Sequence, residues 1–434
     1  MKLYQATLFS FVLITSFAQA DVENSQWITT WSASPQKVWN KDFVFPTLIP
    51  EQVSNQTIRQ MSKISLGGEA VRLVFTNQYG KQPLYIDETT IGLANAATLK
   101  SKSIYPVYFS GQLKARILPG KQLISDPIQL PVPDHTQLVV NSFIQKPTTF
   151  KTFHWDAKQT SWLIRGNQTT NLTTPIDAKT TTARLLLSAI EVKPKQKAHV
   201  VAVVGDSITD GATATLDANT RWTDFLAKRL SVHRMAVVNN GISGNRLLTD
   251  GMGDSVLKRL NSEIFQYSGV KTLIVLVGIN DISWPGTAFA PKQQIPSFEA
   301  LTQGYRRVVS EAHKHNIQVI GTTLLPFSGA LPNTPLDNYY QPNKDQLRQR
   351  INHWIRTSHT FDGVLDLDEG LKDPKHPNRL NPIYDSGDHL HPNDRGNQHM
   401  AELVDLDQIT LYTTNFTEPL SYQDSAFLKL PKFP

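Results

Sequence analysis

The chain has 434 residues, enough for two domains, because a single hydrophobic core usually stops growing at about 250 to 300 residues. Its hydrophobic fraction of 40% is that of a foldable soluble protein, and its net charge of +6 is spread without a long Lys/Arg run, which argues against a nucleic-acid partner. The absence of Cys excludes disulfides, a thiol nucleophile, thiolate metal ligands and a cysteine-linked lipid anchor.

The first twenty residues have the pattern of a secretory signal peptide. Lys2 gives a positive start, residues 6–17 are mainly apolar, and Ala18-Gln19-Ala20 fits the small-x-small cleavage rule. The apolar run is too short to span a bilayer and no later stretch reaches about 18 apolar residues, so we expect no stable membrane insertion. The sequence predicts an exported protein, periplasmic or extracellular, whose mature chain begins at Asp21.

Residues 21–193 are rich in short strands separated by turns. Val71, Leu73 and Phe75 alternate with polar or outward positions, as in a half-buried strand. Further strands are expected over residues 90–93, 105–109, 138–144 and 183–192. Because amphipathic helices are absent from this pattern, we predict an all-β sandwich or jelly-roll accessory domain.

Three residues of this β-rich part have side chains suited to binding. Trp31 and Trp155 could stack on sugar rings, although a core position is the more common one for such aromatics. His154 beside Trp155 is expected to be a hydrogen-bonded structural group rather than a ligand.

After the polar segment 194–197 the pattern changes to alternating strands and helices, which we assign to a second domain over residues 198–405. The run 200–204 is wholly apolar and mostly Val, as in a central parallel strand. Alternation of this kind predicts a parallel sheet covered by helices on both faces. We expect further strands over residues 235–239, 272–278, 317–324 and 363–367, and helices over residues 222–230, 255–265, 298–315, 344–356 and 394–404. Residues 406–434 form a Pro-containing tail.

Four polar segments follow strands of this domain or precede its last helix. Ser207 follows the central strand, Gly244 lies in the loop after the second strand, Asn280 follows the third, and residues 387–393 precede the last helix. Because the carboxyl ends of parallel strands share one edge of a sheet, we expect these segments to meet there. Taken alone, a Gly-Asp-Ser segment is more typical of an ordinary turn serine or helix N-cap than of a catalytic serine.

Together the four segments supply the groups that acyl transfer needs. A serine hydroxyl requires a nearby base, for which His391 is suited, and Asp388 is placed to orient that imidazole. The backbone N–H groups of Ser207 and Gly244 and the side-chain amide of Asn280 are candidate donors to an oxyanion.

The segments Gly205-Asp206-Ser207-Ile208, Gly244-Asn245, Gly278-Ile279-Asn280-Asp281 and Asp388-His389-Leu390-His391-Pro392 resemble, in order, the four motif blocks of the SGNH (GDSL) hydrolases. This family contains esterases, lipases and carbohydrate deacetylases. The resemblance implies a flavodoxin-like three-layer α/β/α hydrolase domain with no cofactor. It also implies that Ser207 is the nucleophile, that Asp388 and His391 complete the triad, and that Ser207, Gly244 and Asn280 donate to the oxyanion. The β-rich half is similar to that of an exported, two-domain, xylan-esterase-like group within the family.

The neighbours of the predicted site allow several interpretations. His389 and His391 lie near Asp388 and Asp394, but the cluster lacks helix-spaced ligands, so no metal is expected. Residues 326–342 form either a rim or lid, with Tyr339 and Tyr340 touching substrate, or a plain surface loop. Arg246 and Trp284 follow the two oxyanion motifs closely and are candidates to line the pocket. Asp206 is expected to cap its turn or the following helix rather than act as an acid. Asp281 is expected to hold its own loop, after the third strand, by hydrogen bonds.

These observations predict an exported serine ester hydrolase that works through an acyl-enzyme. The expected partner is an ester substrate, with a short acyl group such as acetyl on a carbohydrate as the first choice. A lipase or general carboxylesterase is the alternative, and a non-catalytic glycan-binding or surface module is the second alternative.

Overall fold

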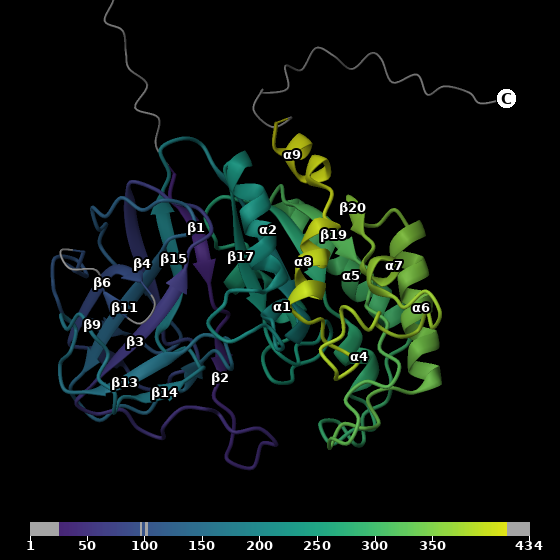
Figure 1. Cartoon of the computed structure of the whole chain (residues 1–434), viewed down its shortest axis with the longest axis horizontal. Coiled ribbons are helices and arrows are strands. Elements are labelled where there is room, and N and C mark those ends of the chain that lie inside the picture. The colour runs from purple at the N-terminus through teal and green to yellow at the C-terminus, as the bar shows by residue number, and fades with distance from the viewer. Residues whose placement is uncertain (1–25, 96–97, 100–102, 415–434) are drawn as a thin grey trace, which may run out of the picture.

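The structure is a computed structural model that describes residues 26–95, 98–99 and 103–414 (Figure 1). The expected signal peptide over residues 1–20 and residues 415–434 of the expected tail lie outside the described residues. Across the described ranges, no helix has the length and apolar character needed to cross a membrane.

The N-terminal half is built on two antiparallel sheets. A four-stranded sheet has the order β1 (Ile28–Ser32), β15 (Leu187–Lys193), β4 (Ala70–Thr76) and β10 (Gln122–Ile124). A seven-stranded sheet contains β14 (Lys179–Thr181), β13 (Ser161–Arg165), β3 (Gln56–Lys63), β11 (Gln137–Ile144), β6 (Glu88–Asn95), β7 (Thr98–Leu99) and β8 (Tyr105–Pro106). Two small ribbons pair β2 (Gln36–Lys37) with β12 (Thr152–Phe153), and β5 (Leu84–Ile86) with β9 (Ala115–Ile117).

The two large sheets share one hydrophobic core, which confirms the predicted β domain as a class of structure. Leu73 and Phe75 of β4 belong to the same buried cluster as Ile58 of β3 and Leu138 of β11. The strand expected over residues 183–192 begins only at Leu187, because Leu186 has a φ of +68°, which an extended strand does not accommodate.

The sequence analysis did not predict the central strand β3, because β3 buries polar side chains on both of its faces. Arg59 is fully buried in β3, where its Nε donates to Asn141 Oδ1 at 2.8 Å and its guanidinium also donates to Thr174 Oγ1 at 3.0 Å. Gln60 and Ser62 are also buried. A strand whose inward positions are polar shows no hydrophobic alternation, so periodicity does not reveal it.

The C-terminal half has a five-stranded parallel sheet in the order β17-β16-β18-β19-β20. Its strands are β16 (His199–Gly205), β17 (Met235–Gly241), β18 (Val270–Leu276), β19 (Gln318–Thr322) and β20 (Gly363–Leu365). Numbered along the chain this order is 2-1-3-4-5, which is the flavodoxin-like order predicted from the family resemblance.

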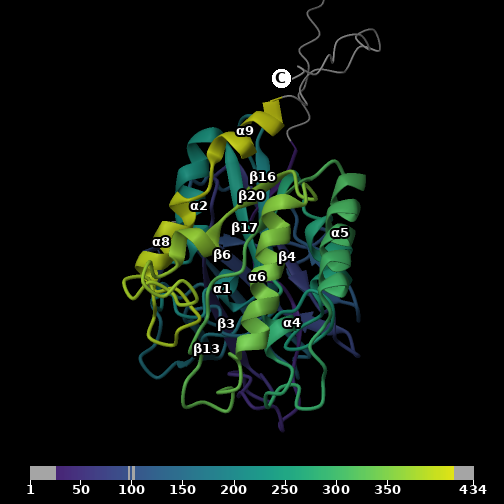
Figure 2. The same ribbon diagram turned by 90° about the vertical axis from the view of Figure 1, so that its right-hand side faces the viewer.

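Helices cover both faces of the parallel sheet, as expected (Figure 2). The first face packs on α3 (Val256–Arg259), the π-helical turn η2 (Leu260–Ile264), α5 (Phe298–Lys314) and α6 (Pro342–Thr357). The second packs on α2 (Trp222–Leu230), α7 (Leu367–Leu371), α8 (Asp394–Glu402) and α9 (Leu406–Thr414), the last of which lies in the expected tail. The remaining helical segments are α1 (Ser207–Asp210), η1 (Ser231–His233) and α4 (Ile279–Ser283). Val201 and Val203 of β16 face the second set of helices, whereas Val200 and Ala202 face the first.

The two halves meet along β1. Ile28 of β1 lies in the same core cluster as Val200 of β16, and Ser32 Oγ donates to the carbonyl oxygen of Asn239 in β17 at 2.9 Å. The segment between β15 and β16 is short, and the domain boundaries at residues 193 and 198 stay a prediction.

Candidate active site

Ser207 is placed by a sharp turn at the carboxyl end of β16. The strand ends at Gly205, and the side chain of Asp206 caps helix α1 by accepting from the backbone N–H of Ile208 at 3.0 Å. A Cβ at position 205 would lie 2.2 Å from Thr209 Oγ1 and 2.6 Å from the carbonyl oxygen of Leu276, so only glycine fits there. The half-buried Ser207 is therefore the first residue of α1, and the expected capping role of Asp206 is confirmed.

The structure brings Ser207, His391 and Asp388 into one hydrogen-bonded chain. Ser207 Oγ lies 2.7 Å from His391 Nε2, and His391 Nδ1 lies 2.6 Å from Asp388 Oδ2. The other carboxylate oxygen, Asp388 Oδ1, accepts from the backbone N–H groups of Leu390 and His391 at 2.9 and 2.8 Å. The residues from opposite ends of the parallel-sheet half therefore meet at proton-transfer distance.

The electrostatics of this chain favour a charged carboxylate. Burial alone would raise the pKa of Asp388, but the hydrogen bond and charge of His391, with the two backbone N–H donors, hold that pKa well below its usual range. A charged Asp388 keeps the proton of a neutral imidazole on Nδ1 and leaves Nε2 free to accept a proton from Ser207.

Gly244 lies in a tightly packed left-handed turn after β17. Its φ is +71°, and a Cβ at this position would come within 2.5 Å of Met252 Sδ and 2.7 Å of Trp284 Cζ2. The backbone here therefore requires glycine for its conformation and for space.

Asn280 is buried in α4, and its side-chain amide is held at both ends. Its Nδ2 donates to the carbonyl oxygen of Asn245 at 3.0 Å, and its Oδ1 accepts from the hydroxyl of Tyr339 at 2.7 Å. An amide nitrogen carries two hydrogens, so the bond to Asn245 leaves one for a ligand. Tyr339 thus fixes the amide orientation, a role that the sequence analysis did not consider.

Asp210, at the end of α1, organises the next layer and was also missed by the sequence analysis. Its Oδ2 accepts from both the backbone N–H and the hydroxyl of Ser243 at 2.9 Å, and its Oδ1 lies 3.1 Å from His154 Nε2. His154 Nδ1 lies 3.0 Å from the carbonyl oxygen of Ser34, which confirms that His154 is a hydrogen-bonded structural group. The only sequence signal for Asp210 is its position one helical turn after Ser207.

Two further buried carboxyl groups flank the site. Burial raises the pKa of Asp206 to about 7 and that of Asp281 to about 6. Asp281 accepts from the backbone N–H groups of Leu247 and Leu248 at 2.7 and 2.9 Å. It therefore holds the loop after β17 and not, as expected, its own loop after β18.

The four residues expected to line the pocket differ in exposure. Trp284 and Tyr339 are buried, with 3% and 1% of their surfaces exposed, and Tyr340 is half-buried against Phe327. Arg246 stacks on Trp284 at 4.8 Å from the ring centroid and donates to Gln293 Oε1 at 2.7 Å. Their contact with substrate stays a prediction.

An aromatic cluster extends from Trp284 to the N-terminal half. Phe289 lies 4.6 Å from Trp284, and it stacks on Phe43 at 5.8 Å and meets Phe45 edge-on at 5.5 Å, measured between ring centroids. Phe45 in turn stacks on Trp155 at 5.5 Å. Except for Trp284, these rings are only half-buried, so the cluster presents an aromatic surface contributed by both halves of the chain.

In the described ranges, no group of three or more His, Asp or Glu residues is placed to hold a metal ion. His389 pairs with Asp385 through Nδ1, whereas His391 pairs with Asp388. The hydroxyl and N–H groups of Thr215 engage Asp394 instead.

Residues 203–399 match the family described as the GDSL-like Lipase/Acylhydrolase family. This match confirms the expected family and the class of carboxylic ester hydrolases. No curated protein matches the chain.

Several solved structures are similar to about half of this chain. A putative lipolytic protein of the G-D-S-L family from Desulfitobacterium hafniense DCB-2 is 19% identical, with 49% of this chain and 98% of that chain covered and a TM-score of 0.35. The acetyl xylan esterase AlAXEase is 17% identical, with 47% and 96% covered and a TM-score of 0.33. A GDSL-like lipase from Bacteroides thetaiotaomicron VPI-5482 is 18% identical, with 49% and 88% covered and a TM-score of 0.35.

Proposed function

We propose that this chain, whose residues 203–399 form a GDSL-like lipase/acylhydrolase domain, is an exported serine esterase that acts through an acyl-enzyme on short acyl esters of carbohydrates. The observation that carries the proposal is the chain of contacts from Ser207 Oγ to His391 Nε2 at 2.7 Å and from His391 Nδ1 to Asp388 Oδ2 at 2.6 Å. Export is inferred from the pattern of residues 1–20.

In the first half of the reaction, Ser207 Oγ attacks the ester carbonyl carbon while its proton passes to His391 Nε2. Asp388 stabilises the imidazolium that forms. The carbonyl oxygen becomes an oxyanion, for which the N–H groups of Ser207 and Gly244 and the free amide hydrogen of Asn280 are the proposed donors. When the tetrahedral intermediate collapses, His391 returns the proton to the departing alcohol oxygen and Ser207 keeps the acyl group.

In the second half, water takes the place of the alcohol. His391 accepts a proton from the water, whose oxygen attacks the acyl carbon, and the same donors hold the second oxyanion. Collapse breaks the bond to Ser207 Oγ, which regains a proton from His391, and releases the carboxylic acid. Both half-reactions balance with Ser207, His391, the ester and one water molecule.

The choice of a carbohydrate ester rests on the resemblance to exported xylan-esterase-like proteins. A general carboxylesterase or lipase is the alternative, and one observation favours it. The half-buried rings of Phe43, Phe45, Trp155 and Phe289 continue from Trp284, whose ring packs against Gly244. An aromatic surface so close to a proposed oxyanion donor suits an apolar or aromatic substrate part as well as a sugar ring.

The test of catalysis is the Ser207→Ala variant of the purified chain. We expect kcat for p-nitrophenyl acetate to fall on the order of 10³-fold or more with the melting temperature unchanged, because the nucleophile is lost and the packing is not. Ser262→Ala, a serine remote from the triad in the π-helical turn η2, is the matched control and should keep full activity. A serine-directed phosphonate should label wild-type Ser207 and leave the variant unlabelled.

A wild-type protein that hydrolyses no ester, while both it and Ser207→Ala bind a glycan equally, would establish the non-catalytic module instead. Substrate profiling separates the enzymatic alternatives. Faster acetate release from acetylated xylan than hydrolysis of octanoyl esters supports the carbohydrate esterase, and the opposite order supports the lipase or general carboxylesterase.

A further inference from the structure

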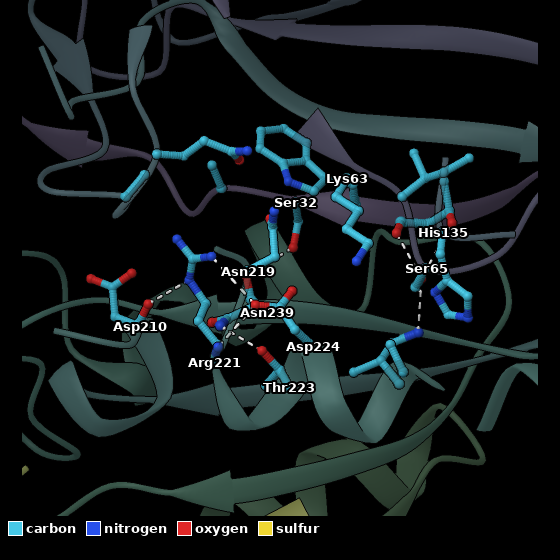
Figure 3. Close-up of a pocket in the computed structure, with 18 of the residues that line it drawn as sticks. Ser32, Lys63, Ser65, His135, Asp210, Asn219, Arg221, Thr223, Asp224 and Asn239 are labelled. Carbon is cyan, nitrogen blue, oxygen red and sulfur yellow. Dashed lines mark hydrogen bonds and ion pairs between the residues drawn. The ribbon is translucent and has the colours of Figure 1, made fainter. Parts of the chain in front are cut away.

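A small cavity lies between the β-rich half and the helices α1 and α2. Its volume is about 60 Å³, which is room for several water molecules or a compact ion. Figure 3 shows Lys63 reaching from the β half toward the segment that carries Arg221 and Asp224, and Arg184 and Gln159 line the same cavity. Lys63, Arg221 and His135 are half-buried, so the cavity communicates with solvent at its rim.

The guanidinium of Arg184 is buried in this cavity and is incompletely hydrogen-bonded. Arg184 is 2% exposed, its NH2 group donates to Gln159 Oε1 at 2.8 Å, and its side chain lies over the Trp31 ring at 5.2 Å from the centroid. Among the described residues, no partner reaches Nε or NH1 of Arg184. Burial of a charged donor without an acceptor is costly, and native structures usually supply one.

A second buried N–H donor in this cavity also lacks an acceptor among the described residues. Gln159 Nε2 is buried and has no acceptor within the described part of the chain, and its orientation is set because Gln159 Oε1 accepts from Arg184. All the buried side-chain atoms of the cavity that lack a partner are therefore N–H donors. The complement of such a set is a ligand that only accepts hydrogen bonds.

The carboxylates around the cavity are committed to other groups. Asp210 is engaged by Ser243 and His154, and Asp217 accepts from the backbone N–H and the hydroxyl of Thr160, both at 2.6 Å. Asp224 accepts from the backbone N–H of Arg221 at 3.0 Å. Burial and the positive charge of Arg221 lower the pKa of Arg184 to about 9, which leaves it charged at neutral pH.

We propose that this cavity is a binding site for a small oxyanion of the phosphate or sulfate class. Oxygens of the anion accept from an unpartnered N–H group of Arg184 and from Gln159 Nε2. Lys63 supplies further positive charge, whereas the guanidinium of Arg221 is paired with Asp224, with Nη1 3.5 Å from Oδ2. The site is separate from ester hydrolysis, and a bound anion joins the β half to the segment between α1 and α2.

The test is the thermal unfolding of the whole chain in phosphate, sulfate or acetate, each against chloride at equal ionic strength. An anion that binds only the folded protein raises the melting temperature, and we expect a rise of a few degrees at 50 mM phosphate. Calorimetric titration with phosphate should give one site per chain. The Ser207→Ala variant should respond like the wild type, so this result is independent of catalysis.

Two variants locate the site. Gln159→Glu places a carboxylate beside Arg184 and should abolish the phosphate response while the melting temperature in chloride is kept or raised. Lys63→Gln, at the half-buried rim, should weaken phosphate binding about threefold, the usual effect of one partly screened charge. Gln112→Glu, an exposed position elsewhere in the β half, makes the same change of charge and should leave the response intact.

Equal melting temperatures in phosphate and chloride, or a phosphate response that survives in Gln159→Glu, would overturn the proposal. Equal melting temperatures in the two salts would mean that water, and not an anion, fills the cavity. A crystal soaked in selenate provides the direct reading: an anomalous peak beside Arg184 supports the site, and peaks confined to the protein surface refute it.

Discussion

The hydroxyl of Tyr339 donates a 2.7 Å hydrogen bond to the side-chain oxygen of Asn280, while the amide nitrogen of Asn280 holds the carbonyl oxygen of Asn245. Tyr339 comes from the Pro-rich segment before α6, and Asn280 lies in the first turn of α4. A residue outside the four motif blocks therefore sets the direction in which a proposed oxyanion donor points.

Tyr339→Phe removes this bond and keeps the ring. We expect kcat to fall about tenfold with KM nearly unchanged, because a misdirected donor loses part of the 10²- to 10³-fold effect of an oxyanion contact. Tyr108→Phe, which removes the hydroxyl of an exposed tyrosine in the β half, is the control. Equal kinetics of the two variants would show that Tyr339 serves packing alone.

Asp388→Asn tests the third member of the proposed catalytic triad. The amide nitrogen that this change introduces cannot accept the Nδ1 proton of His391, so the imidazole would adopt the wrong tautomer. We expect kcat to fall by about 10³- to 10⁴-fold, which is the size of the effect of such a tautomer change in a serine hydrolase triad. The neighbouring pair offers a control, because Asp385 accepts from His389 as Asp388 does from His391. Asp385→Asn should keep nearly full activity.

Asp206→Asn tests, through stability, the buried carboxyl group beside Ser207, the proposed nucleophile. Burial raises the folded-state pKa of Asp206 to about 7, against about 3.9 in an unfolded chain. The protonated carboxyl of Asp206 therefore contributes its full stabilisation of the folded state below about pH 4. This contribution decreases as the pH rises from about 4 to about 7, and above about pH 7 no further change is expected. The asparagine has no such loss.

We therefore expect the unfolding free energy of Asp206→Asn, relative to wild type, to increase by about 2 to 3 kcal/mol between pH 5 and pH 8, at about 1.4 kcal/mol per pKa unit. Urea unfolding at the two pH values measures it. Asp42→Asn, an exposed control, should show no such pH dependence. A constant difference between Asp206→Asn and wild type would mean that Asp206 stays ionised.

Gly244→Ala tests the packing of the loop after β17. The new Cβ would meet Met252 Sδ at 2.5 Å and the rigid ring of Trp284 at 2.7 Å, at a φ of +71°. Gly286→Ala is a matched control for strain, because Gly286 has a φ of +82° with nothing within 4 Å of its Cβ position.

We expect Gly286→Ala to cost about 1 kcal/mol of stability with activity kept, which is the usual penalty for a positive φ. Gly244→Ala should lose most activity on top of that cost, as the oxyanion loop is displaced. If both variants retain wild-type kcat, the loop accepts the new Cβ without being displaced.

The catalytic half was predictable because its strands are apolar and its motif residues follow strand ends. The apolar run from Val200 to Val204 predicts a buried strand. The motif blocks of the family occur in the same order along this chain, with Ser207, Gly244, Asn280 and His391 in them. The contribution of Tyr339 was not predictable, since no sequence pattern connects a loop tyrosine with an asparagine in another helix.

In the β half, prediction failed where polar side chains point inward. Arg59 and Asn141 are fully buried and pair with each other, so β3 lacks the hydrophobic alternation of β4. The link between Asp210 and His154 was equally hidden, because it joins residues of the two halves that have no sequence relation. Such polar contacts arise only when the whole fold is assembled.

The core cluster that contains Ile28 runs without interruption from the sandwich into one face of the parallel sheet. The two halves therefore share a single hydrophobic interior and should melt in one cooperative transition. If the chain were cut at residue 198, removal of the β half would expose Val200, Ala236 and Val238 to solvent. The hydrolase half is therefore expected to aggregate when it is produced alone.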